Sequence, residues 1–186
     1  MIVETTPIDD LLILTPARYG DARGWFSETW NRRRMEGAGL DYSFVQDNQS
    51  FSAAQHTLRG LHYQAPPHAQ AKLVQCLQGA IWDVAVDVRE GSNTFGQWHG
   101  VELSAENGRQ FLIPDGFLHG FVTLSANALI QYKCSGFYAP DHEGGVLWSS
   151  LDIDWKGVTT PFLSDKDAHA PEFSAWQSPF VRRDLG

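Results

Sequence analysis

Short runs of alternating apolar and polar residues fill the chain from about residue 42 to residue 138. They are rich in Val, Ile, Leu and aromatic residues, and Gly, Asn, Pro and Asp separate them. Many short strands with regular turn signals indicate an antiparallel sandwich or jelly roll, rather than alternating strands and helices. The sequence predicts strands in the runs YSFVQDNQSFS, TLRGLHYQ, AKLVQCLQ, AIWDVAVDVR, GQWHGVEL, RQFLIP, HGFVTLS and ALIQYKCSGFY.

The N-terminal region has a different pattern, which predicts one strand and one helix. The run LLIL at residues 11–14 predicts a short strand. The run SETWNRRRMEGAGL predicts one short helix, because Ser27 or Thr29 suits an N-cap and Gly37 or Gly39 suits a terminator.

After Tyr138 the chain becomes irregular, with the loop-like stretches APDHEGG, SSLDIDW and LSDKDAHAPEF. Neither a repeat nor an interdomain linker interrupts the sequence. We therefore expect a single domain over residues 1–186, mainly β, with a short N-terminal helix and an irregular C-terminal cover.

Polar residues inside the predicted strands carry the first functional signal. In AIWDVAVDVR, strand alternation puts one apolar set on one face, and the other face receives Ile81, Asp83, Ala85 and Asp87. A carboxylate in mid-strand is costly to bury without a partner. Asp83 therefore has either a local structural role or a functional one, and the sequence leaves both open.

The run LRGLHYQ raises a question of geometry. Strict alternation sends Arg59 and His62 to opposite faces of a strand, although both suit a polar site. Gly60 lies between them. We predict a bulge or twist at Gly60 that brings both side chains into one site.

Composition narrows the choice of partners and compartment. The formal net charge of −8 argues against nucleic acid, which requires a basic face. The first residues, MIVETTPIDD, lack the pattern of a secretory signal, and no apolar run approaches the length of a membrane span. Cys76 and Cys134 lie in strand-like runs without metal-type spacing, so reduced thiols and a cytoplasmic location are expected.

One motif resembles the cupin jelly rolls. The run GRQFLIPDGFLHGF contains the second cupin motif through Gly108, Pro114, Gly116 and His119, where the histidine usually binds a metal. The first cupin motif is altered, and its ligand positions carry His62, Gln64 and Lys72.

These replacements make a poor metal site. A protonated ammonium has no lone pair to donate and repels a cation, which leaves two histidines and an amide. A metal-dependent cupin that uses His62, His68 and His119 remains an alternative. His62, Lys72 and Tyr132 are instead suited to moving protons next to a carbonyl.

The chain also resembles one family closely, the dTDP-4-dehydrorhamnose 3,5-epimerases, from about residue 8 to residue 170. The resemblance rests on the runs GDARGWFSE, FVQDNQS, LRGLHYQ, KLVQCLQGAIWDVAVDVR, TFGQW, IPDGFLHGF, YKCSGFYAP and LSDKD. It implies a cupin jelly roll without metal or other cofactor, a homodimer, and a dTDP-4-keto-6-deoxyhexose substrate in dTDP-L-rhamnose synthesis.

The resemblance also implies catalytic roles. His62 looks like the base that removes a proton next to the C4 ketone, and Asp167 is the matching carboxylate partner, although Asp83 competes for that place on local grounds. Tyr132 resembles the acid that protonates the opposite face of the sugar. Lys72 is similar to the residue that stabilises the enolate oxygen.

Substrate contacts follow from the same resemblance. Arg23, Arg59 and His119 match phosphate or sugar contacts, and Tyr138 matches an aromatic residue that stacks on thymine. The remaining matching positions are Glu28, Gln46, Asp47, Asn48, Glu143 and Lys166, together with Lys72. The resemblance suggests that the N-terminal contacts cross a dimer interface.

Two further alternatives accompany the 3,5-epimerase hypothesis. A related enzyme could epimerise only one carbon, or act on another nucleotide sugar. A sugar-binding module without catalysis would explain a pocket, but not a base and an acid together.

Overall fold

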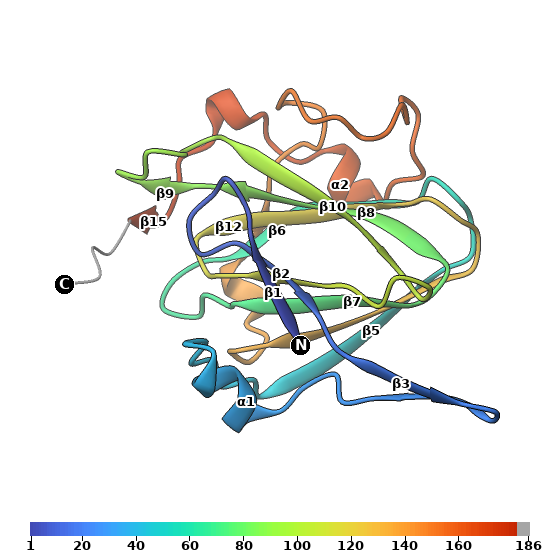
Figure 1. Cartoon of the computed structure of the whole chain (residues 1–186). Helices are drawn as coiled ribbons and strands as arrows, with labels where there is room; N and C mark the ends of the chain where they lie inside the picture. The colour runs from blue at the N-terminus through green and yellow to red at the C-terminus, as the bar shows by residue number, and fades with distance from the viewer. Residues whose placement is uncertain (182–186) are drawn as a thin grey trace.

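The fold consists of two antiparallel sheets that face each other, as the computed structural model of residues 1–181 shows (Figure 1). One sheet has the order β1 (Ile2–Thr5), β2 (Leu12–Thr15), β11 (Gln110–Ile113), β7 (Lys72–Gln78), β13 (Ala128–Cys134) and β5 (Gln46–Ser52). The other has the order β10 (Trp98–Ser104), β8 (Ala80–Asp87), β12 (Phe117–Thr123), β6 (Leu58–Gln64) and β14 (Glu143–Gly145). This confirms the mainly β, cupin-type jelly roll, although residues 182–186 of the expected domain lie outside the described part.

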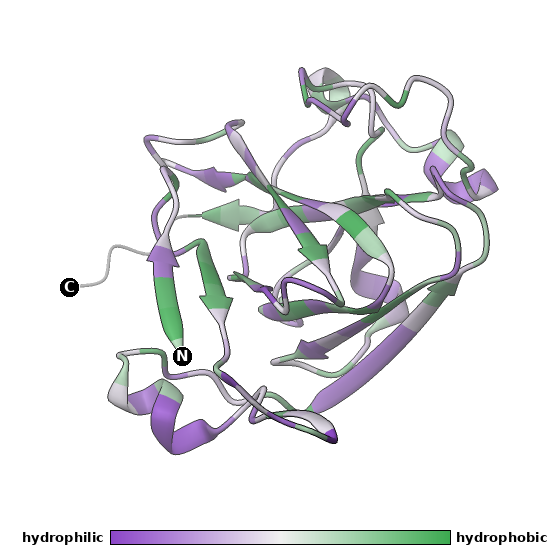
Figure 2. Ribbon diagram, turned by 45° about the vertical axis from the view of Figure 1, so that its right-hand side comes forward, coloured by the Kyte–Doolittle hydropathy of each residue, from purple (hydrophilic) through white to green (hydrophobic). Residues whose placement is uncertain are grey.

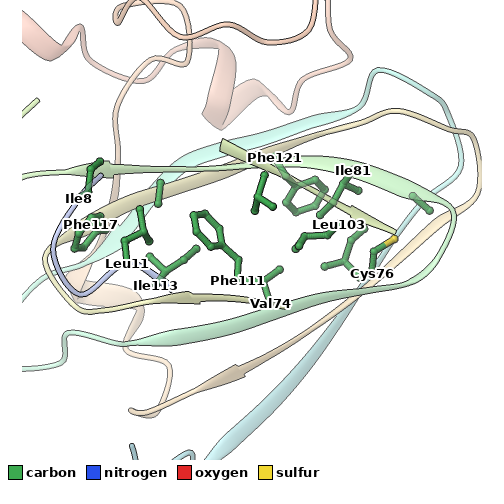
Figure 3. Close-up of a cluster of buried hydrophobic side chains, with 14 residues drawn as sticks. Ile8, Leu11, Val74, Cys76, Ile81, Leu103, Phe111, Ile113, Phe117 and Phe121 are labelled. Carbon is green, nitrogen blue, oxygen red and sulfur yellow. The ribbon is translucent and has the colours of Figure 1, made fainter. Parts of the chain in front are cut away.

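Apolar side chains fill the space between the sheets. Figure 3 shows Val74 and Phe111 from one sheet pointing toward Ile81 and Phe121 from the other. Each such side chain contributes roughly 1.5–3 kcal/mol when it is fully buried. The hydrophobic effect therefore holds the two layers together.

A second cluster covers the outer face of the five-stranded sheet. Val84 and Val86 of β8 and Val88 just after it pack there against Ile153 and Trp155 of the C-terminal segment. The alternation predicted for AIWDVAVDVR is confirmed, because Ile81 and Ala85 belong to the cluster between the sheets. The C-terminal cover contains α2 (Asp165–Ala168), the 3-10 turns Pro140–His142 and Phe173–Ala175, and β15 (Phe180–Val181), which pairs with β9 (Arg89–Glu90).

The predicted N-terminal helix exists but begins later than expected. Helix α1 spans Arg32–Gly37, and the side chain of Asn31 caps it by accepting a hydrogen bond from the Arg34 amide. Ser27 and Thr29 are therefore wrong as N-caps; Ser27 instead ends β4. Gly39 follows the helix with φ +78°, in agreement with its role as a terminator. Figure 2 shows that α1 is mainly hydrophilic.

The N-terminal region also contains two features that the sequence analysis did not predict. Strand β1 forms the edge of the six-stranded sheet, and β3 (Arg18–Asp21) and β4 (Gly24–Ser27) form a hairpin. The hairpin projects away from the body in Figure 1. Its exposed aromatic residues are Tyr19, Trp25 and Phe26.

A bulge interrupts the pairing of β6 with β12, as predicted. His119 pairs with His62 and Phe121 pairs with Arg59, so β12 advances two residues while β6 advances three. Residues directly opposite in an antiparallel pair point to the same face. Arg59 and His62 therefore share the inner face with His119 and Phe121.

Gly60 is required at this bulge. Its φ is +128°, and a Cβ atom there would lie 2.5 Å from the Gly120 Cα atom. Only glycine combines that backbone conformation with so close an approach of two strands.

Within residues 1–181, none of the helices has both the length and the apolar character needed to cross a membrane.

Candidate active site

The imidazole of His62 lies against the carboxylate of Asp167. His62 Nε2 is 2.6 Å from Asp167 Oδ1, and the Asp167 side chain is buried while that of His62 is partly open. Ser164 caps helix α2 by accepting a hydrogen bond from the Asp167 amide, which fixes the carboxylate above β6. A short helix of the C-terminal cover thus delivers the partner of a residue on the sheet.

The carboxylate determines which ring nitrogen of His62 is free. A carboxylate only accepts hydrogen bonds, so Nε2 carries the hydrogen and Nδ1 keeps the lone pair in the neutral ring. Burial raises the pKa of Asp167, but the hydrogen bond and charge of His62, with smaller contributions from the Gly60 amide and Ser164, lower it below its ordinary value. Asp167 therefore stays ionised and stabilises the protonated ring.

A second histidine–aspartate pair lies beside the first. His119 Nε2 is 2.7 Å from Asp83 Oδ1, and both residues are buried. Asp83 therefore has His119 as its partner, and His62 has Asp167, which decides between the two candidates for the His62 carboxylate. The sequence analysis identified Asp83 as a buried carboxylate in need of a partner, but strand alternation alone does not reveal which strand supplies one.

Lys72 and Tyr132 come from the opposite sheet. Cys134 pairs with Lys72 and Tyr132 pairs with Val74, so these four residues share one face. Val74 and Tyr132 belong to the cluster between the sheets, which makes this the inner face. The two sheets consequently present His62 and Tyr132 toward a common interior.

Electrostatic interactions link these groups. Burial lowers the pKa of Lys72, while the charges of Cys134, Asp83 and Glu143 oppose that shift. Burial likewise lowers the pKa of His119, and the charge of Lys72 adds to the shift. Lys72 and His119 also line one pocket.

Tyr132 keeps its proton at neutral pH. Burial raises the pKa of its phenol, and the charge of Cys134 adds to this, whereas the charge of Arg59 lowers it. A protonated phenol can donate its hydrogen to a reacting atom.

Polar residues that interact with His62 and Tyr132 form a connected network. The Tyr138 hydroxyl donates to Glu143 Oε2 at 2.7 Å, and Lys166 donates to the other oxygen of Glu143. Gln46 joins them by accepting from the Tyr138 amide at 3.0 Å and donating to Asn48 Oδ1. Burial raises the pKa of Glu143, but its bonds to Lys166 and Tyr138 and the charges of Lys166 and His62 lower it overall.

Three predicted substrate contacts lie elsewhere. Asp47 pairs with Lys133 on the outer face of the six-stranded sheet, at 2.8 Å. Arg23 lies at the tip of the β3–β4 hairpin, where it pairs with Asp21, and its side chain is 90% exposed. Glu28 pairs with Arg34 of α1. The single chain thus does not bring these residues to the pocket that Lys72 and His119 line.

Two positions of the possible metal set also differ from metal ligands. The Gln64 amide donates to the carbonyls of His68 and Phe137 and accepts from the Ala139 amide, so it ties two loops together. His68 is exposed, with its ring 4.5 Å from that of His142. Among the described residues, His62, His68 and His119 do not form a group that could hold a metal ion.

Comparison with known proteins gives the family. The model of the dTDP-4-dehydrorhamnose 3,5-epimerase family matches residues 5–175. The chain belongs to this family. The dTDP-4-dehydrorhamnose 3,5-epimerase of Salmonella typhimurium is 52% identical over 174 residues, which cover 92% of this chain and 94% of that protein.

Solved structures agree with this assignment. A dTDP-4-dehydrorhamnose 3,5-epimerase from Bacillus anthracis with TDP and PPi bound has a TM-score of 0.89 and 50% identity, and the match covers 91% of this chain and 98% of that one. The epimerase of Legionella pneumophila in complex with dTDP-4-keto-L-rhamnose has a TM-score of 0.92 and 46% identity. The match covers 98% of this chain and 99% of that one. A 3′-monoepimerase from Streptomyces bikiniensis in complex with dTDP-quinovose has a TM-score of 0.85 and 35% identity. The match covers 91% of this chain and 86% of that one.

Proposed function

We propose that this chain converts dTDP-4-dehydro-6-deoxy-D-glucose into dTDP-4-dehydro-L-rhamnose by inverting C3 and C5, as a step of dTDP-L-rhamnose synthesis. One observation carries the proposal: His62 on one sheet, with Asp167 of α2 as its partner, faces the same interior as Tyr132 on the other sheet. Inversion at carbon requires proton removal on one side and proton delivery on the other, and the two sheets supply one group each.

The chemistry balances as two proton transfers at each carbon. His62 Nδ1 takes the proton next to the ketone, the C–H electron pair forms the enolate, and negative charge develops on the C4 oxygen. The Lys72 ammonium stabilises that charge, which is commonly worth several kcal/mol of barrier. Tyr132 then donates its proton to the opposite face of the same carbon, and solvent restores the protonation states of both side chains.

Substrate binding follows the polarity of the site. Arg59 and His119 lie on the inner face of the five-stranded sheet, where a planar guanidinium suits the oxygens of a diphosphate. Tyr138 is exposed, so its ring can stack on thymine. It bonds Gln46 and Glu143, which in turn bond Asn48 and Lys166.

The experiment that tests this function is incubation with dTDP-4-keto-6-deoxyglucose in deuterated water, followed by NMR of C3 and C5. A 3,5-epimerase incorporates deuterium at both carbons with inversion at both. Incorporation at one carbon alone assigns the chain to the single-carbon class, of which the Streptomyces bikiniensis relative is an example. A sugar-binding module incorporates none.

We also propose that catalysis requires no metal ion. Support comes from Lys72 and Gln64, which occupy two of the positions where cupins carry metal ligands, and from the exposed location of His68. Full turnover after chelation and dialysis is expected. Loss of activity that a divalent metal restores would contradict this proposal.

A homodimer would explain the residues that lie outside the pocket. Exposed apolar side chains gather on β1 and the β3–β4 hairpin, including Ile2, Trp25 and Phe26. We propose that the hairpin of one subunit carries Arg23 to the site of its partner. Light scattering should then give twice the chain mass of 20.8 kDa, and Arg23→Ala should raise KM more than it changes kcat; a monomer with full activity would contradict the proposal.

The remaining proposals concern organisation and compartment. We propose that residues 1–186 act as one epimerase domain. Cys76 and Cys134 are both free and buried, as is common in a reducing compartment, which supports a cytoplasmic location. Partial proteolysis that released a stable fragment with its own fold would contradict the first of these proposals.

A further inference from the structure

The carboxylate of Asp83 has one oxygen that the known contacts do not use. Asp83 is fully buried, and Oδ1 accepts from His119, but Oδ2 has no hydrogen-bond partner among the described side chains and backbone. A buried carboxylate oxygen without a partner is costly, so it indicates a group that approaches when the site is in use.

Lys72 is the cation placed to fill that role. It lines the same pocket as His119, the residue that Asp83 holds, and it extends from the facing sheet. The charge of Asp83 raises the pKa of Lys72 against the lowering effect of burial. The other titratable groups that act on Lys72 are Cys134 from β13, Glu143 from β14 and His119 from β12.

We propose that Asp83 is a positioning residue that keeps the Lys72 ammonium protonated and directed at the developing enolate oxygen, while its other oxygen holds His119. This inference rests on the proposed function, because it assigns the purpose of Lys72 in that reaction. Asp83 itself touches neither the sugar nor the transferred protons.

Asp83→Asn isolates the charge. The amide oxygen can still accept from His119 Nε2, but the negative charge is gone and an amide N–H group replaces the free oxygen. Lys72 must be protonated to act, so activity is complete below its pKa and falls as pH rises through it. Removal of Asp83 lowers that pKa, and the basic limb of the kcat profile should move to lower pH by about one unit or more.

Asp87→Asn is the matched control. Asp87 lies on the same strand and is equally buried, but it bonds Arg89, Ser92 and Thr94. The control should lower the melting temperature and leave the basic limb in its wild-type position. If the profile of Asp83→Asn coincided with those of the wild type and the control, Asp83 would be purely structural and the proposal would be overturned.

A stability cycle tests the same pair without turnover. Thermal melting compares three variants: Lys72→Met, Asp83→Asn and the double variant. The double variant should lose less stability than the sum of the two single losses, because neither charge is then left buried alone. Additive losses overturn the proposal. If Asp83→Asn alone does not fold, recovery of folding in the double variant supports the pairing, and failure of both contradicts it.

The cycle also separates this inference from the proposed function. A wild-type protein that converted no dTDP-sugar would refute the function, while the melting data would still decide whether Asp83 and Lys72 are coupled.

Discussion

The two histidine–aspartate pairs have nearly the same geometry but different surroundings. His62 lies 2.6 Å from Asp167 and its side chain is 30% exposed, whereas His119 lies 2.7 Å from Asp83 and is 9% exposed. The first pair joins a strand to a helix of the C-terminal cover, and the second joins two neighbouring strands of one sheet. One pair is open to solvent on the histidine side, and the other is enclosed.

The difference agrees with the different tasks that we propose for the two pairs. A base must reach substrate and change its charge in each cycle, so it requires access and a carboxylate that tolerates both states of the ring. A residue that positions others benefits from rigidity, which strands and burial provide. The predictions below test this division of labour, beginning with the largest expected effect.

Replacement of the accessible histidine should have the largest effect. His62→Ala removes the base, and we expect deuterium exchange at both C3 and C5 to fall by about 10³-fold. NMR in deuterated water measures this loss. The control is His68→Ala, which removes an exposed histidine beside His142 and should retain wild-type exchange; substantial exchange in His62→Ala would place the base elsewhere.

Gly60 lies next to both pairs, because its amide donates to Asp167 Oδ2 and a Cβ atom added to it would meet the carbonyl oxygen of His119. Gly60→Ala forces a Cβ atom to within 2.5 Å of Gly120 Cα and 2.8 Å of His119 O, at φ +128°. We expect the free energy of unfolding to fall by about 3 kcal/mol in urea titrations.

Gly24→Ala is the control for backbone strain. Gly24 has a similar φ of +131°, but a Cβ atom there would meet nothing within 4 Å. Gly24→Ala should therefore lower the free energy of unfolding clearly less than Gly60→Ala does. Equal losses would mean that strain, and not the close approach of β6 and β12, explains the glycine.

Removal of the charge on Asp167 should have a moderate effect. Asp167→Asn keeps the shape of the side chain but no longer stabilises the protonated His62 ring, so kcat should fall about tenfold to a hundredfold. Steady-state kinetics measures this change. A change in KM with unaltered kcat would show that Asp167 serves substrate binding instead.

The smallest expected effect is on stability at acid pH. The pKa of Asp167 is lowered in the folded protein, so its contribution to stability is present above the unfolded value of about 3.8 and is lost as pH falls through the folded pKa. The difference in urea midpoint between wild type and Asp167→Asn should therefore narrow between neutral pH and about pH 3. A constant difference across that range would contradict this interpretation.

Local patterns predicted the strands of the jelly roll well, because burial of one face imposes alternation on strands such as β8. The Gly60 bulge also had a local signal, a glycine between two polar residues. The predicted N-cap of α1 was wrong because Ser27, Thr29 and Asn31 are all residue types that suit this position. Tertiary contacts decide among them, and the cap is Asn31.

The pairings within the site lay beyond local reasoning. Asp167 is 105 positions from His62 in sequence, and only the family resemblance connected them. The partnership of Asp83 with His119 depends on the order of the strands in the sheet. Arg23 and Glu28 matched the family pattern, yet in the single chain they pair with Asp21 of the hairpin and Arg34 of α1, and neither lines the pocket of Lys72 and His119.

The most direct test of the two-sided site is the deuterium exchange of Tyr132→Phe. The account predicts that this variant still removes the protons next to the ketone and incorporates deuterium, but returns it mainly with the original stereochemistry, so that inversion falls much more than exchange. An equal loss of exchange and inversion would contradict the assignment of base and acid to opposite sheets.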